Sequence, residues 1–132
     1  MNADTLARIR LVVLGLAGAI CASYALLAVL LNTPQPFTVW GPAAAGITAS
    51  VVIWVSAFVA GERNTGIAMD ELYKREWGLS IQFSYWFGIV LFILAAVAVA
   101  KGMISQSTGV AAFGTAYGAS LLLAFCIISL RS

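Results

Sequence analysis

The side chains with the most obvious capacity for chemistry lie in one short stretch near the middle of the chain. Seven of the twelve charged residues (seven basic and five acidic in all) fall between Glu62 and Glu76. Acid-first pairs at helical (i, i+4) spacing, Asp70–Lys74 and Glu71–Arg75, predict a helix that begins near Met69, and each pair stabilises it by only ~0.2–0.5 kcal/mol. The preceding segment, "GERNTG", predicts a turn-rich linker.

Two interpretations of this charged helix are open. It could dock onto a cytosolic or membrane partner, or it could be a solvated helix end whose apolar stripe rests on lipid headgroups. The candidate docking residues are Met69, Asp70, Glu71, Leu72, Tyr73, Lys74 and Arg75. Because the stretch carries a net charge of −1 (four acids and three bases in 62–76), it does not predict a polybasic lipid-binding patch.

Neutral polar residues are the second group that could bind something. Counting along the apolar runs places Tyr24, Thr48 and Tyr117 at one depth, and Trp54, Gln82 and Tyr85 at another. Either layer could line a polar cavity for a lipid headgroup, quinone or solute, or could serve only for hydrogen bonding between helices. We expect neither a metal nor a cofactor, because the chain has no histidine and only two separated cysteines. We do not expect an enzyme, because the chain has no nucleophile–base pair or paired carboxylate outside the charged helix.

Four apolar runs must position these residues. The chain is 62% hydrophobic and has a mean hydropathy of +1.00. The runs 11–31, 39–60, 78–100 and 110–130 contain no charge, and each has the ~20 residues that a helix needs to cross ~30 Å of hydrocarbon. We therefore expect a single domain, an all-α integral membrane four-helix bundle, with residues 61–77 as its charged loop and the third helix extended into the cytoplasm.

The basic residues predict the orientation. Six of the seven lie on the side that holds both termini and the charged loop, and only Lys101 lies on the other side. This bias predicts cytoplasmic termini in a bacterial inner membrane.

Small residues predict close helix packing. Gly114 and Gly118 form a GxxxG motif, and Gly15 and Ala19 have the same spacing in the first apolar run. These stripes could pack within one chain or between chains. The third run differs, because it is rich in aromatic residues that could face lipid or fill the grooves between small residues.

The middle third of the chain, "MDELYKREWGLSIQFSYW", resembles small uncharacterised four-helix inner-membrane proteins of bacteria. The resemblance implies the topology and no particular activity. Together these features favour an accessory, assembly or interaction subunit of an inner-membrane complex, whose partners are the lipid bilayer and a membrane protein or a second copy, without nucleic acid. The alternative is a small transporter, channel or lipid- or quinone-binding protein that acts alone or as a homo-oligomer.

Overall fold

A computed structural model describes all residues from 1 to 132 and consists of four long helices without strands. The helices are α1 (Ala3–Leu31), α2 (Trp40–Ala68), α3 (Glu71–Ala100) and α4 (Gln106–Arg131). Each is long and apolar enough to cross a membrane. The predicted all-α fold with four helices of membrane-spanning length is thus confirmed.

Local sequence sets where the helices begin. The side chain of Asn2 accepts a hydrogen bond from the N–H of Thr5 at 2.8 Å, and that of Asp70 accepts one from the N–H of Tyr73 at 3.0 Å. Such N-caps satisfy amide groups that have no partner within the helix. The expected start of the third helix near Met69 is therefore two residues early, because Asp70 caps the helix that begins at Glu71.

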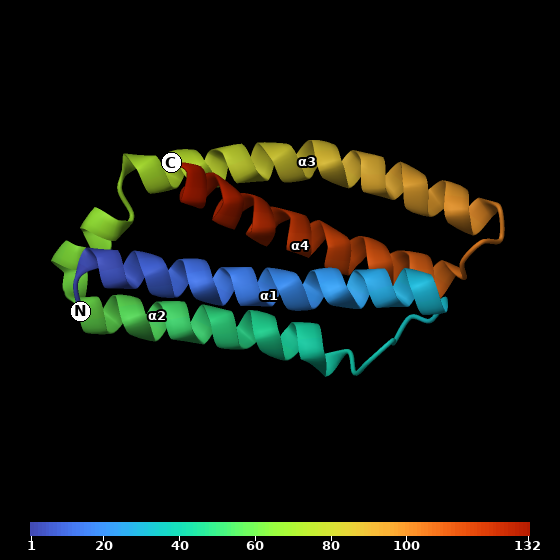
Figure 1. The fold of residues 1–132 in the computed structure, drawn as a ribbon, viewed down its shortest axis with the longest axis horizontal. Helices are drawn as coiled ribbons and strands as arrows, with labels where there is room; N and C mark the ends of the chain where they lie inside the picture. The colour runs from blue at the N-terminus through green and yellow to red at the C-terminus, as the bar shows by residue number, and fades with distance from the viewer.

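The four helices lie in the order α2–α1–α4–α3 (Figure 1). Helix α1 packs on α2 and α4, whereas α3 packs mainly on α4. The central pair is therefore α1 and α4, and each outer helix has one main neighbour. Both termini lie at the same end of the molecule, together with the connection between α2 and α3 (Figure 1). We call this the terminal end, and the other the loop end.

The α2–α3 connection departs from the expected turn-rich linker. Gly61 has φ +80° and ψ 166°, which breaks α2, and the chain then continues as a short helix to Ala68. Only glycine readily adopts this backbone conformation. Residues 62–68, which we call the strap, lead across the terminal end from α2 to α3 (Figure 1). The strap packs on the beginning of α1, where Leu6 forms an apolar cluster with Ala60 and Ala68.

Helix α3 turns its small and polar residues inward. The buried residues of this helix recur every four positions and are Glu76, Ser80, Ser84 and Gly88. Its large aromatic residues lie mostly outside, with Trp86 63% and Phe92 61% exposed. In a membrane those exposed rings face lipid, so of the two expectations for this aromatic helix the structure favours the lipid-facing one.

Candidate functional site

Arg10 connects α1 to all three other helices at the terminal end. Its side chain is only 8% exposed. Its Nη1 donates a hydrogen bond to the carbonyl of Ala68 at 3.0 Å, and its Cζ lies 4.0 Å from the ring centre of Tyr73 and 5.6 Å from that of Phe125. Because Ala68 is the last residue of the strap, the positive charge sits at a helix C-terminus, where it is stabilising.

Glu76 is the second buried charge of this end. It is 6% exposed, and its Oε2 accepts a hydrogen bond from Ser129 Oγ at 2.6 Å. That bond joins the first part of α3 to the last turn of α4. Glu76 also exerts an attractive field on Arg10, as Asp70 does. A buried charge is costly unless opposite charge or hydrogen bonds compensate it, and here both contribute.

An aromatic group separates these charges from the apolar interior. Trp77 stacks on Phe125 with ring centres 4.4 Å apart and planes at 17°, and Tyr73 meets Phe125 edge-on at 5.8 Å. Phe125 is fully buried and contacts Leu14 and Cys126. Stacked and edge-on rings each stabilise by about 0.5–1.5 kcal/mol beyond their burial. We refer to Arg10, Tyr73, Glu76, Trp77, Phe125 and Ser129 as the charged cluster.

Two N–H donors of the charged cluster have no hydrogen-bond partner. They are Arg10 Nε and Trp77 Nε1, and both atoms are shielded from solvent. Buried donors without a partner are rare in folded proteins. Since neither atom is accessible, the cluster cannot bind a ligand through them without first opening, and its geometry is that of a structural tie.

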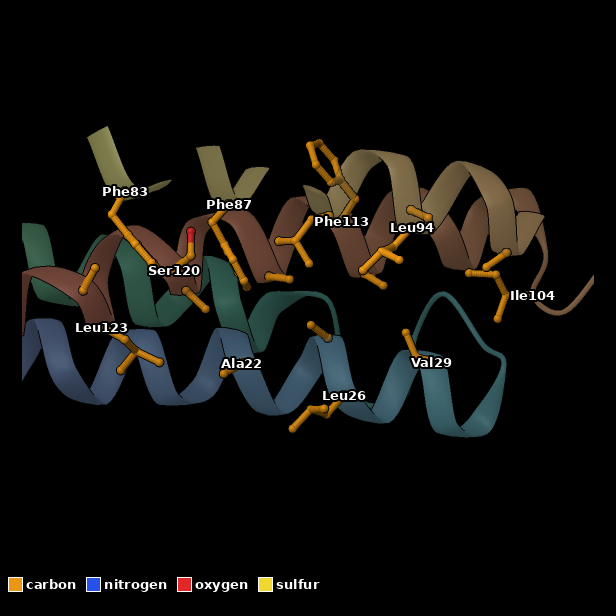
Figure 2. A pocket seen from close by; sticks show the side chains of 18 of the residues that line it. Ala22, Leu26, Val29, Phe83, Phe87, Leu94, Ile104, Phe113, Ser120 and Leu123 are labelled. Atoms are coloured by element: carbon orange, nitrogen blue, oxygen red, sulfur yellow. The ribbon is translucent and has the colours of Figure 1, made fainter. Parts of the chain in front are cut away.

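A long concavity lies elsewhere, between α1 and α3. It has a volume of about 930 Å³, and 20 of its 21 lining residues are apolar. Figure 2 shows Phe83 and Phe87 projecting from α3 into this groove, with Phe87 across from Ala22 of α1. Helix α4 contributes lining residues from Ala112 to Ile128. The sixteen residue-to-residue steps from Ala112 to Ile128 rise about 24 Å, so the groove runs along most of a bilayer's hydrocarbon.

Ser120 is the only polar residue in the groove. Its hydroxyl donates to the carbonyl of Tyr117 at 2.7 Å, and its oxygen lies within hydrogen-bond distance of Ser84 Oγ at 3.3 Å. The hydroxyl is therefore already engaged in the α3–α4 contact. The groove offers its occupant apolar surface, with almost no basis for hydrogen-bonded recognition.

The predicted docking residues separate into two groups. Asp70, Glu71, Leu72, Lys74 and Arg75 are exposed, and Met69 lies at the limit of exposure at 36%, so these six residues remain accessible. Tyr73 instead faces the interior beneath Arg10. The first two turns of α3 also pack against the end of α4 through Glu76 and Trp77. The helix therefore presents one charged face rather than an isolated projection.

The structure does not bring the predicted polar layers together. Tyr24 is buried, but its hydroxyl donates to the carbonyl of Pro34 at 2.7 Å, whereas Thr48 is exposed on α2 and Tyr117 packs on Gly88. The second predicted layer lies on outer surfaces of α2 and α3. There Trp54 is 72% exposed, Tyr85 is 57% exposed and Gln82 is exposed. Neither layer lines a shared cavity.

Only one of the four small residues predicted to pack closely between helices does so. Gly114 and Gly118 of the GxxxG motif have open space where a Cβ would lie, and Ala19 is exposed. Gly15 faces Cys126, and its neighbour Gly18, which the pattern missed, lies against Leu122 and Leu123. The close α1–α4 contact therefore uses Gly15 and Gly18, and the GxxxG motif packs against nothing within the chain.

Sequence reasoning missed the two buried charges. Arg10 and Glu76 border apolar runs, where charges ordinarily mark the membrane surface. One signal was present, because the four-residue spacing of Glu76, Ser80, Ser84 and Gly88 marks a helix face without bulky residues. The aromatic residues between these positions made the pattern difficult to recognise in the sequence.

Comparison of the chain with protein-family models, curated proteins and solved structures gives no match.

Proposed function

We propose that this chain is a small multi-pass protein of the bacterial inner membrane that acts as an interaction or assembly subunit. Its apolar groove between α1 and α3 would receive a transmembrane helix of a partner protein. The single observation that carries this proposal is the length and apolar character of the groove.

The floor of the groove suits a helix. Alanine residues line it on three sides, including Ala25 of α1, Ala95 of α3, and Ala112 and Ala116 of α4. Small side chains let helix backbones approach closely, and van der Waals packing is the main source of helix association in lipid. A groove of about 24 Å also matches a spanning helix better than it matches a compact solute.

The charge distribution supports cytoplasmic termini. Six of the seven basic residues flank the terminal end, and Lys101 lies in the connection at the loop end. By the positive-inside rule the terminal end faces the cytoplasm, together with the strap and the exposed charges of α3. The accessible side chains of Lys74 and Arg75 would then offer the same partner a cytoplasmic contact.

A second candidate function is binding of a lipid or another long apolar molecule. The volume of about 930 Å³ supports it, because small-molecule sites range over ≈ 300–1,000 Å³. In this alternative an acyl or isoprenoid chain would lie along the stacked rings of Phe83 and Phe87, whose centres are 5.5 Å apart.

The test begins with purification from the native membrane in mild detergent, through a tag on the C-terminus. We expect a stoichiometric membrane-protein partner. Ala116→Trp would fill the groove and should lower partner recovery at least about fivefold, since overfilling a contact costs about 1–3 kcal/mol. Ala96→Trp is the matched control, because Ala96 is exposed on α3 and does not line the groove.

The outcomes separate the two candidates. Equal partner recovery with Ala116→Trp and Ala96→Trp would overturn the groove as the partner site. A chain that purifies alone, with a tightly bound lipid that Ala116→Trp removes, would establish the second candidate instead.

A further inference from the structure

One side chain, Arg10, holds the strap and the beginning of α3 at the same time. It donates to the carbonyl of Ala68 at the end of the strap and lies over the ring of Tyr73 in the first turn of α3. Only two residues, Met69 and Asp70, separate the strap from α3. With so short a connection, the position of the strap constrains where α3 can begin.

Helix α3 has few other polar ties to the rest of the molecule. They are the bonds of Glu76 to Ser129 and of Ser84 to Ser120, both to α4. Towards the loop end, α3 is held by apolar contacts, such as the edge-on pair of Phe92 and Phe113 at 5.8 Å. The polar ties of α3 are therefore concentrated towards the terminal end.

The same helix forms one wall of the groove. Phe87 of α3 lies across the groove from Ala22 of α1, and Leu94 of α3 lies level with Val29 of α1 (Figure 2). Because α3 packs mainly on α4, no extensive direct contact between α3 and α1 fixes the width of the groove. A rotation of α3 about α4 would open or close the groove.

We propose that residues 62–68 form a strap which Arg10 locks, and that the locked strap sets the position of α3 and hence the width of the groove. The inference rests on the proposed function only for what the groove width would serve, because the lock itself is a property of the isolated chain. Gly61 is the hinge, because its φ of +80° lets α2 end and the strap turn across the terminal end.

The guanidinium group is suited to this position. It is planar, so it can lie flat on the ring of Tyr73 while an N–H at its edge reaches the Ala68 carbonyl. It also stays charged when buried, which a lysine does less readily. Arg8, two residues earlier, is exposed and makes the matched control.

The first experiment is limited trypsin digestion of the purified chain in lipid nanodiscs, with cleavage after Arg63 in the strap followed by mass spectrometry. Release of the strap should raise the rate of this cleavage about tenfold in Arg10→Ala, because protease cleaves the locally opened form. Arg8→Ala should match the wild type. Equal rates in Arg10→Ala and Arg8→Ala would overturn the lock.

The second measurement follows groove width by the distance between spin labels at Leu16 of α1 and Trp86 of α3, which are 62% and 63% exposed. Cys21 and Cys126 are replaced by alanine in this background. We expect Arg10→Ala to broaden or shift the distance distribution and Arg8→Ala to leave it unchanged. Faster cleavage with an unchanged distance would overturn the coupling between strap and groove.

If Arg10→Ala does not reach the membrane, the pair Arg10→Lys and Arg8→Lys keeps the topology-determining charge. Arg10→Lys should still exceed Arg8→Lys in cleavage at Arg63, and equal rates would again overturn the lock. All these measurements use the isolated chain, so failure to capture a partner would refute the proposed function without affecting them.

Discussion

The two ends of this molecule are held together by different chemistry. At the terminal end, buried charges tie α1, the strap, α3 and α4 together through Arg10 and Glu76. At the loop end the ties are neutral hydrogen bonds. Tyr24 donates to Pro34, and Asn32 Oδ1 accepts from the N–H of Ser105 at 3.1 Å.

The difference follows from how far apart the helices are that the chain connects at each end. At the loop end the connections join neighbouring helices, α1 to α2 and α3 to α4, so short neutral bonds suffice. At the terminal end the chain must travel from α2, at one edge of the helix order, to α3 at the other. A charge-assisted hydrogen bond is about twice as strong as a neutral one and can hold such a crossing. Its cost is that losing one partner leaves a buried charge uncompensated.

The largest effect should come from Glu76→Ala. The change removes the bond to Ser129 and an attractive charge near Arg10. We expect the free energy of unfolding to fall by about 1.5–3 kcal/mol, the range for hydrogen bonds to charged groups. Titration with SDS in mixed micelles measures it. Glu71→Ala, at an exposed position of the same helix, should cost less than about 1 kcal/mol. Equal losses would show that the terminal end gains nothing from its buried charge.

Gly61→Ala should have the next largest effect. Alanine does not readily adopt φ +80° with ψ 166°, so the break before the strap becomes strained by about 1–3 kcal/mol. Gly66→Ala within the strap has open space and should stabilise by up to about 1 kcal/mol through helix propensity. Thermal unfolding followed by circular dichroism compares the two. A neutral result for Gly61→Ala would mean that the break is not needed for the crossing.

Tyr24→Phe tests the loop end. It removes the hydroxyl bond to Pro34 and keeps the edge-on contact with Phe37, whose ring centre is 4.9 Å away. The expected loss in the free energy of unfolding is about 1 kcal/mol, as for a neutral hydrogen bond. Tyr85→Phe, which removes an exposed hydroxyl, should change it by less than about 0.5 kcal/mol. A loss as large as that of Glu76→Ala would remove the distinction between the ends.

Asn32→Gly should give the smallest effect. Glycine tolerates the left-handed conformation of this residue, φ 48° and ψ 49°, so the change removes only the bond to Ser105. We expect a loss of about 0.5 kcal/mol in the same SDS titration. Asn32→Ala should cost about 1 kcal/mol more, because alanine is strained there. If both variants cost the same, the left-handed turn does not contribute to the stability of the loop end.

Much of the architecture was predictable because it depends on composition and local pattern. Four charge-free runs of spanning length require four helices, since lipid cannot satisfy exposed backbone groups. The first, third and fourth predicted runs fall inside α1, α3 and α4, and the second run begins one residue before α2, at Val39. The six-to-one division of basic residues likewise predicts the orientation from the sequence alone.

The contacts between helices were not predictable in the same way. Many small-residue stripes satisfy the rule for close packing, and only the global arrangement selects Gly18 over the GxxxG pair of Gly114 and Gly118. The polar residues at equal depth did not meet, because depth along a helix leaves its rotation undetermined. Trp54 and Tyr85 therefore lie on outer faces of helices that do not adjoin.

The sequence by itself determined the number of helices, their membrane-spanning length and the side on which the charges collect, because these follow from hydropathy and charge counted along the chain. Only the tertiary structure decided which charges are buried. Arg10 and Glu76 resemble their exposed neighbours Arg8 and Glu71 in the sequence, yet the helix order and the break at Gly61 turn them inward. Burial depends on helix rotation and on neighbours distant in the chain, and these are fixed by packing.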